Sequence, residues 1–157
     1  MEVNNKNIVH DLYKALAARD FIRVQCLLAP HIDWWFHGPP SHKYNLMQLL
    51  TGSCVLDDNM DSFKPIAIVG FGSMVVAEGY HLHGNRKTCW VHAWTVENGK
   101  IITRVREYLN TSLTIFSFIK SSDSNACLVS PRSPKCKNVW QSELADNASV
   151  PRLLLML

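Results

Sequence analysis

Charged residues are scarce in this chain, and no block of like charges occurs in it. Asp, Glu, Lys and Arg make up 18% of the 157 residues, and the formal net charge is +3. Proteins that bind nucleic acid concentrate basic residues in one run or on one face, where they neutralise phosphates. We therefore expect no nucleic-acid partner.

Long apolar runs are also missing. No stretch approaches the ~20 consecutive apolar residues that a membrane-spanning helix needs. The N-terminal sequence MEVNNKNIVHDLYK is polar where a signal peptide would carry its apolar segment. We therefore expect no membrane span and a cytoplasmic or nuclear location.

The spacing of cysteines and histidines gives no sign of a metal site or a disulfide framework. The five cysteines are odd in number and none forms a CxxC pair, which favours reduced and mostly buried thiols. His81 and His83 would share one face of a strand, but two ligands without a third are a weak metal signal. We expect no metal and no cofactor.

The first fifty residues carry apolar side chains at helical spacing. Ile8, Leu12 and Leu16 predict a first helix that begins at Asn7. A second helix is predicted from a cap at Asp20 to a stop at Pro30, and a third from a cap at Ser41 to Gly52.

After residue 62 the apolar period changes from that of a helix to two, which indicates strands. Predicted strands cover 63–70, 73–82, 88–96 and 100–109, and an earlier strand covers 32–37; an extension of the last strand through Phe116 is left open. Helices followed by an antiparallel meander predict the α+β class.

The tetrapeptide Glu97-Asn98-Gly99-Lys100 predicts a hairpin with a type I′ turn, because Asn-Gly tolerates the positive φ angles that this turn requires. In the register that follows, Trp94 opposes Thr103. One face then carries Trp90, His92 and Trp94, and the other carries Val91, Arg106 and Tyr108; a one-residue bulge would exchange these sets.

The aromatic sequence WWFHGPP, at residues 34–40, ends an alternating strand with a Gly-Pro-Pro stop. Such a strand leaves two tryptophans, a phenylalanine and an imidazole at the rim of a sheet. This arrangement is typical of the mouth of a pocket.

WWFHGPP, the helix MQLLTG, the block CWVHAWTVENGKIITRVREYLNTSL and the tail NVWQSELADNASVPRLLLML resemble the plant wound-induced protein 1 family. That family is a branch of the nuclear transport factor 2-like and SnoaL-like superfamily. The resemblance implies a cone-shaped, curved antiparallel sheet packed on two to three N-terminal helices. It also implies an open end that admits an apolar small molecule, and a homodimer formed through the outer face of the sheet.

The chain divides into three parts by composition. Residues 1–118 form the SnoaL-like domain, and 119–138, rich in Ser, Pro and Lys, form a flexible linker. Residues 139–157 are apolar and would be costly to leave in water, so this tail is expected to dock on the domain or on a partner.

Isomerases and cyclases of this superfamily use an acid or a histidine near the end of the first strand, together with donors that polarise a carbonyl. On that pattern the base position falls at Phe36 or His37, so His37 is the candidate base. Arg106 and Tyr108, on the expected inner face, are the candidate donors. Val91 stands where a second acid would be expected, and Glu78 and Glu107 fall at unmatched positions. The standard carboxylate mechanism is therefore disfavoured. Without a ligand at Arg106, its expected partner is a carboxylate such as Asp33.

Two functions remain open from the sequence. One is a protein that holds an apolar intermediate or assists a partner enzyme of stress or specialised metabolism without catalysis of its own. The other is an isomerase or cyclase that uses His37. The predicted ligand-binding residues are Tyr13, Trp35, Phe36, His37, Val91, Arg106 and Tyr108, and the predicted dimer interface is formed by Trp90, His92 and Trp94.

Overall fold

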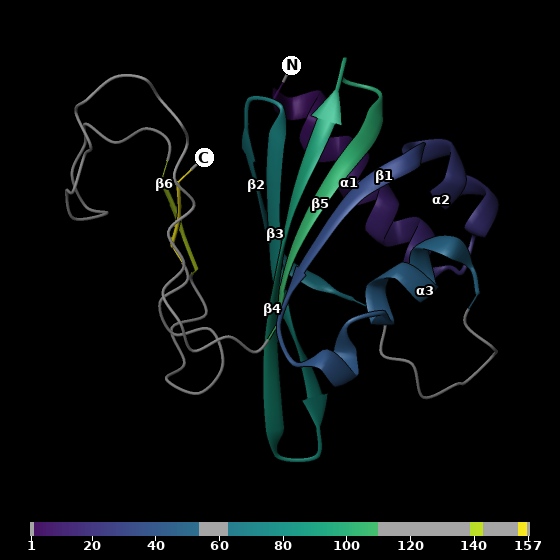
Figure 1. The fold of residues 1–157 in the computed structure, drawn as a ribbon. Coiled ribbons are helices and arrows are strands. Elements are labelled where there is room, and N and C mark those ends of the chain that lie inside the picture. Colours follow the sequence, from purple (N-terminus) through teal and green to yellow (C-terminus); the bar gives the residue numbers. More distant parts are fainter. Residues whose placement is uncertain (1, 54–62, 110–138, 143–153, 157) are drawn as a thin grey trace.

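The computed structural model describes residues 2–53, 63–109, 139–142 and 154–156. The predicted linker 119–138, and the extension of the last strand through Phe116, lie outside the described residues. Between these gaps the chain forms helices first and strands second, which confirms the predicted α+β class (Figure 1).

Three α-helices precede most of the sheet: α1 (Glu2–Ala17), α2 (Phe21–Leu27) and α3 (Asn45–Thr51). The predicted cap of α2 is confirmed, since the backbone N–H of Arg23 donates to Asp20 Oδ1 at 3.0 Å. The left-handed Gly52, with φ 67°, ends α3 as predicted. The predicted cap at Ser41 is wrong, because Ser41 lies inside a 3-10 turn, Pro40–His42, that precedes α3.

The main sheet has five strands in the order β1-β5-β4-β3-β2. These strands are β1 (Leu28–His37), β2 (Pro65–Phe71), β3 (Met74–His83), β4 (Arg86–Glu97) and β5 (Ile101–Leu109). Strands β2 to β5 form the predicted antiparallel meander. Strand β1 pairs with β5 in parallel, so the sheet is mixed rather than fully antiparallel. This pairing brings the aromatic end of β1 beside Tyr108.

The β4–β5 hairpin turns at the predicted residues. Asn98 and Gly99 have φ angles of 53° and 62°, and Lys100 N donates to Glu97 O at 3.0 Å. The register differs from the prediction, because a bulge between Thr95 and Val96 places Trp94 opposite Val105 rather than Thr103. The residue opposite Trp94 has moved from Thr103 to Val105, which is an even number of positions. The residues predicted to share a face along Trp90 to Trp94 therefore still share it.

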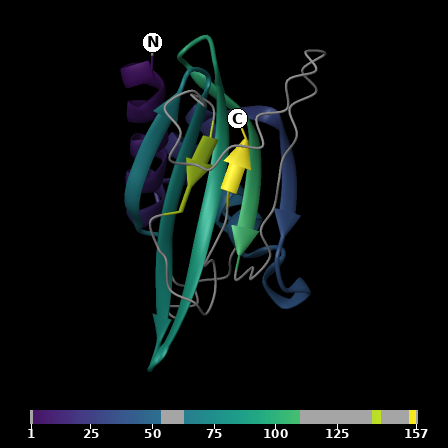
Figure 2. The same cartoon turned by 90° about the vertical axis from the view of Figure 1, so that its left-hand side faces the viewer.

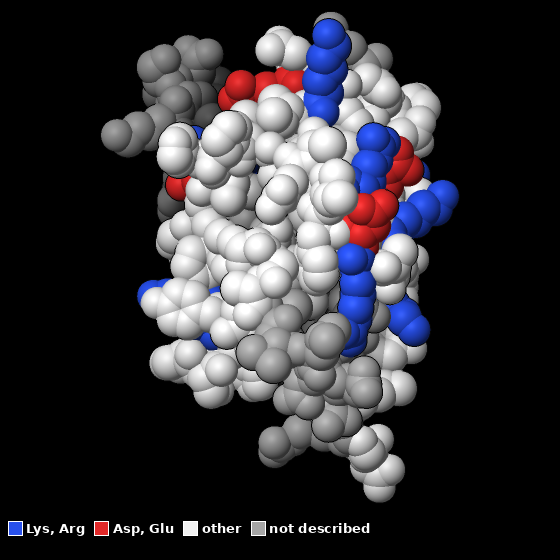
Figure 3. Space-filling model, turned by 90° about the vertical axis from the view of Figure 1, so that its right-hand side faces the viewer, with Lys and Arg blue, Asp and Glu red and all other residues white. Residues whose placement is uncertain are grey.

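All three helices lie on one side of the curved sheet, which is called the inner face below (Figure 1). Leu12 and Leu16 of α1 pack there as predicted from their helical spacing, together with Val9 and the partly buried Ile8. The helix-covered side of the molecule carries charged side chains of both signs, gathered mainly along one edge (Figure 3). No helix of the described part is long and apolar enough to cross a membrane.

A short hairpin of β6 (Val139–Gln141) and β7 (Leu154–Met156) lies on the opposite side of the sheet, the outer face (Figures 1 and 2). Trp140 from this hairpin is only 6% exposed and packs against Val91, Ala93 and Tyr108. Beside it, Ser142 Oγ donates to Glu78 Oε2 at 2.6 Å. The described part of the C-terminal tail therefore contacts its own domain.

Candidate functional site

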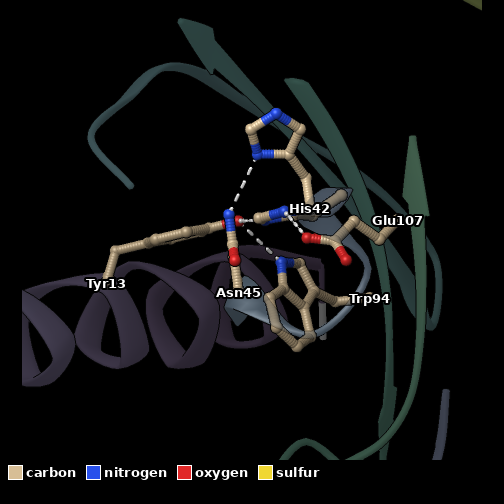
Figure 4. A network of polar contacts seen from close by, with 6 residues as sticks. Tyr13, His42, Asn45, Trp94 and Glu107 are labelled. Atoms are coloured by element: carbon tan, nitrogen blue, oxygen red, sulfur yellow. Dashed lines mark hydrogen bonds and ion pairs between the residues drawn. The ribbon is translucent and has the colours of Figure 1, made fainter. Parts of the chain in front are cut away.

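A buried polar cluster lies between α1 and the inner face of the sheet, and Figure 4 labels its members Tyr13, Trp94 and Glu107. Its fourth member is His92, which lies between Tyr13 and Glu107. The Tyr13 hydroxyl lies 2.7 Å from His92 Nδ1 and accepts a hydrogen bond of 2.9 Å from Trp94 Nε1. His92 Nε2 lies 3.2 Å from Glu107 Oε2. This set, called the central cluster, links a helix to two strands at the heart of the fold.

One arrangement of protons satisfies these contacts with a neutral imidazole and an ionised Glu107. Trp94 Nε1 can only donate, so the Tyr13 oxygen accepts there and its own proton points to His92 Nδ1. His92 Nε2 then carries the ring proton and donates it to Glu107 Oε2. The phenol of Tyr13, the imidazole of His92 and the carboxylate of Glu107 are thereby connected in series by hydrogen bonds.

Aromatic rings enclose the central cluster. The Trp90 and His92 rings stack with centroids 4.5 Å apart, and Phe63 lies 4.8 Å from His92 and 5.2 Å from Trp90. Glycine is required at residue 79, because a Cβ there would come within 2.5 Å of the Trp90 ring and of the Lys64 carbonyl oxygen. Closely packed rings thus occupy the centre of the cone, where the resemblance implied an open hollow.

Two polar atoms near the centre lack a hydrogen-bond partner among the described residues. They are Trp90 Nε1 and Glu107 Oε1. An unpaired buried donor or acceptor costs about 1–3 kcal/mol, so such atoms are uncommon and call for an explanation. Within the described part of the chain, a donor and an acceptor are thus left unpaired in the same core.

Burial raises the pKa of Tyr13 well above its usual 10.0; the hydrogen bond from Trp94 opposes this shift, and the charge of Glu107 adds to it. Burial also raises the pKa of Tyr108, against a lowering by Arg106. Above pH 10 the unfolded chain therefore ionises tyrosines that the folded chain keeps protonated, and the free energy of unfolding falls as pH rises.

We expect that loss to reach at most about 1.4 kcal/mol per pH unit for each such tyrosine, since one pKa unit corresponds to about 1.4 kcal/mol. Urea unfolding measured between pH 8 and pH 11 tests it. Tyr13→Phe should make the decline above pH 10 shallower, whereas Tyr44→Phe, at a tyrosine that is 58% exposed, should leave it unchanged. If the free energy of unfolding declined equally with pH in the unchanged protein and both variants, the loss could not be assigned to Tyr13.

The structure corrects the predicted position of the Trp90, His92 and Trp94 face. We expected these residues on the outer face as a dimer interface, but all three are fully buried against the helices. Their placement follows from α1, whose Tyr13 bonds to two of them. They are not available to a second copy of the chain.

The predicted ligand-binding residues are divided between the two faces. Tyr13 and Phe36 are on the inner side, where Phe36 packs against the main core. The remaining five are on the outer face, where we expected them inside: Trp35, His37, Val91, Arg106 and Tyr108. The sheet therefore separates Tyr13 and Phe36 from the predicted base His37 and its predicted donors.

On the outer face, His37 and Trp35 lie close to Tyr108. The Trp35 and Tyr108 ring centroids are 5.3 Å apart, and those of His37 and Tyr108 are 6.3 Å apart. The expected ion pair of Arg106 with Asp33 is not found; Arg104 Nε donates to Asp33 Oδ2 at 2.7 Å instead. Glu78, whose carboxylate is bonded to Ser142, is also on this face.

Glu107 is the functional candidate that the sequence reasoning misjudged. We treated it as an acid at an unmatched position, yet its side chain is 1% exposed and paired with His92 inside the core. The signal was present in the strand alternation, which puts Glu107 on the Trp90 and Trp94 face. An acid flanked by large apolar residues on a buried face requires a partner.

A surface groove lies between α1 and the edge strand β2. Its volume is about 430 Å³, and its lining comprises Lys6, His10, Tyr13, Lys14, Ala17, Phe63, Lys64, Pro65, Ile66, Ala67 and Ile68. Tyr13 and Phe63 belong both to this α1–β2 groove and to the packing around the central cluster. The groove therefore reaches the residues that cover the buried polar atoms.

Metal ligands are not gathered in the part of the chain that the structure describes. Within those ranges no three His, Cys, Asp or Glu side chains come close enough to hold an ion. The residues of the central cluster offer hydrogen bonding and apolar contact.

Sequence comparison relates the chain to plant proteins. A family model described as wound-induced protein WI12 matches residues 47–157. Wound-induced protein 1 of Solanum tuberosum is 43% identical over 113 residues, which are 71% of this chain and 100% of that protein. Senescence associated gene 20 of Arabidopsis thaliana is 39% identical over 115 residues, with the same coverage of 71% and 100%.

Solved structures show the same fold. An NTF2-like protein from Burkholderia xenovorans has a TM-score of 0.53 and 25% identity, covering 71% of this chain and 92% of its own. A putative ketosteroid isomerase from Kribbella flavida has a TM-score of 0.51, but only 10% identity, over 85% and 93% of the two chains. The second likeness concerns the fold alone.

Proposed function

The chain belongs to the wound-induced protein WI12 family and has the NTF2-like fold, and from this premise we propose that it is a stress-related protein that holds a small apolar ligand in the α1–β2 groove. In this proposal it delivers or shelters a metabolic intermediate, or assists a partner enzyme, in the cytoplasm or nucleus. It performs no catalysis of its own.

The observation that carries the proposal is the groove itself. Its volume of about 430 Å³ falls within the range of small-molecule sites, and most of its lining side chains are apolar. Ile66 is 54% exposed there, so the groove presents apolar surface to solvent. A guest in the groove would bury this side chain.

The absence of catalysis in this proposal follows from how the central cluster is bonded. Both nitrogens of His92 and the hydroxyl of Tyr13 are already engaged with each other and with Glu107 and Trp94. A general base needs a free position within hydrogen-bond reach of its substrate. The geometry favours a structural role for these groups over proton transfer.

Two alanines at the end of α1 provide the test of the binding site. Ala17 lines the groove, whereas its neighbour Ala18 does not, and both are exposed. Ala17→Phe should fill part of the groove and weaken binding of the neutral fluorophore N-phenyl-1-naphthylamine by about tenfold, since a lost apolar fit raises Kd. Fluorescence titration gives the Kd directly.

Ala18→Phe is the matched control and should leave the Kd within about twofold of the unchanged protein, because it adds the same ring outside the groove. Equal weakening by both substitutions, or no saturable binding to the unchanged protein, would refute the groove as the ligand site.

One observation favours a proton-transfer enzyme as a second candidate. Glu107 Oε1 has no partner among the described residues, so the carboxylate could take a proton from a guest while His92 holds its other oxygen. In this alternative Glu107 and His92 replace His37 as the base. Turnover of a ketone substrate that is lost in Glu107→Gln, but retained in His37→Ala, would establish it.

A further inference from the structure

We propose that the α1–β2 groove selects an amphipathic anion, meaning an apolar molecule that carries a negative charge at one end. The inference rests on the proposed ligand-holding function and adds the chemical class of the ligand. It follows from the charged side chains at the rim of the groove. An uncharged apolar ligand on the floor of the groove would not need them.

The rim is basic on two sides. Lys6, His10 and Lys14 follow one another at intervals of four residues along α1, so they form one row on the helix surface, and all three are exposed. Lys64 stands at the other side, next to the start of β2. The groove is thus flanked by lysines from two separate elements.

Acidic side chains do not compensate this charge within the described residues. The lining contains no Asp or Glu. Asp11 of α1 lies 3.6 Å from Arg23 of α2 instead. No ion pair joins Lys6, Lys14 or Lys64 to another described side chain, so a bound anion would meet ammonium groups that have no other ionic partner there.

The floor of the groove explains why the anion should be amphipathic. Phe63, Ile66 and Ile68 present apolar surface between the lysines, and a small hydrated ion would gain nothing from contact with it. Lysine is a mobile point charge without the fixed fork of arginine, so it accepts carboxylate and phosphate headgroups alike. An aliphatic chain on the floor and a headgroup at the rim would use both features.

Three ligands of graded chemistry test the proposal on the full chain. Laurate and dodecyl phosphate carry chain and charge, and dodecanol carries the same chain without charge. Isothermal titration below the micelle concentration should give a Kd for both anions that is about tenfold lower than that for dodecanol, because exposed ion pairs contribute modestly and here act together. Raising ionic strength should narrow this difference through screening.

The substitution that removes the rim charge is Lys6→Gln, Lys14→Gln and Lys64→Gln in one protein. It should raise the Kd of laurate by about tenfold and that of dodecanol by less than about twofold. Lys43→Gln is the matched control, since Lys43 is an exposed lysine outside the groove, near Trp34 and Tyr44. It should change neither Kd.

The outcomes separate this inference from the proposed function. Equal affinity for laurate and dodecanol, unchanged by the triple substitution, would overturn the charge selection while leaving an apolar ligand site in place. Failure of dodecanol and both anions to bind would overturn both proposals. Loss of laurate affinity in the Lys43→Gln control as well would also overturn the assignment to the groove rim.

Discussion

Replacing His92 by alanine should lower the free energy of unfolding by about 3–5 kcal/mol, the usual cost of removing one partner from a buried charged or hydrogen-bonded pair. The Tyr13 hydroxyl would lose its acceptor at 2.7 Å, and Glu107 Oε2 would lose its donor at 3.2 Å. Neither group can reach water, because both side chains are almost fully buried. Urea unfolding followed by tryptophan fluorescence measures the loss.

Controls for this prediction exist within the same fold. His31→Ala, at an exposed histidine, should change the free energy of unfolding by less than about 0.5 kcal/mol. Trp94→Phe should cost about 1 kcal/mol more than Trp90→Phe, because only the Trp94 Nε1 has a partner and both rings are fully buried. If His92→Ala costs no more than His31→Ala, the central cluster does not stabilise the fold.

Much of the fold was predictable because local signals agreed with one another. The helical spacing of Leu12 and Leu16, the cap at Asp20 and the turn at Asn98 each depend on neighbouring residues only. These signals set the element order and the α+β class. The parallel pairing of β1 with β5 depends on how the chain folds back over residues 38–100, and no local pattern specifies it.

The side of the sheet that the helices cover was not predictable from alternation. A period of two shows which residues share a face, but here both faces are apolar: Trp90 and Trp94 on one, Val91 and Ala93 on the other. The choice is made by Tyr13, whose hydroxyl bonds to His92 and Trp94 across 79 and 81 positions of sequence. A contact between residues so far apart in the sequence produces no local sequence pattern.

The rim of the groove could have been found from the sequence. Lys6, His10 and Lys14 stand at intervals of four residues in a predicted helix, and the same helix carries its apolar row at Ile8, Leu12 and Leu16. The position of Lys64, next to the start of the edge strand, could not have been found in this way, because α1 and β2 come together only in the folded protein. The ligand class is therefore a result of tertiary packing.

Trp140→Ala should detach the C-terminal hairpin from the outer face of the sheet. Truncating a buried tryptophan costs roughly 3–5 kcal/mol, and this hairpin has few other described anchors beyond the Ser142 to Glu78 hydrogen bond. Cys89, fully buried in the same apolar cluster, reports the change. Its alkylation, resolved by peptide mass spectrometry, should accelerate at least about tenfold, while exposed Cys26 should react unchanged.

The same substitution decides how the outer face relates to the predicted homodimer. Trp140 occupies the apolar surface of Val91 and Tyr108 in the single chain, so a second copy could use that surface only after the hairpin leaves it. Trp140→Ala should therefore raise the dimer fraction in sedimentation velocity at micromolar concentration, whereas Gln141→Ala, at the exposed neighbour, should not. A Trp140→Ala protein with slow Cys89 alkylation and an unchanged sedimentation coefficient would mean that the hairpin is not what covers this face.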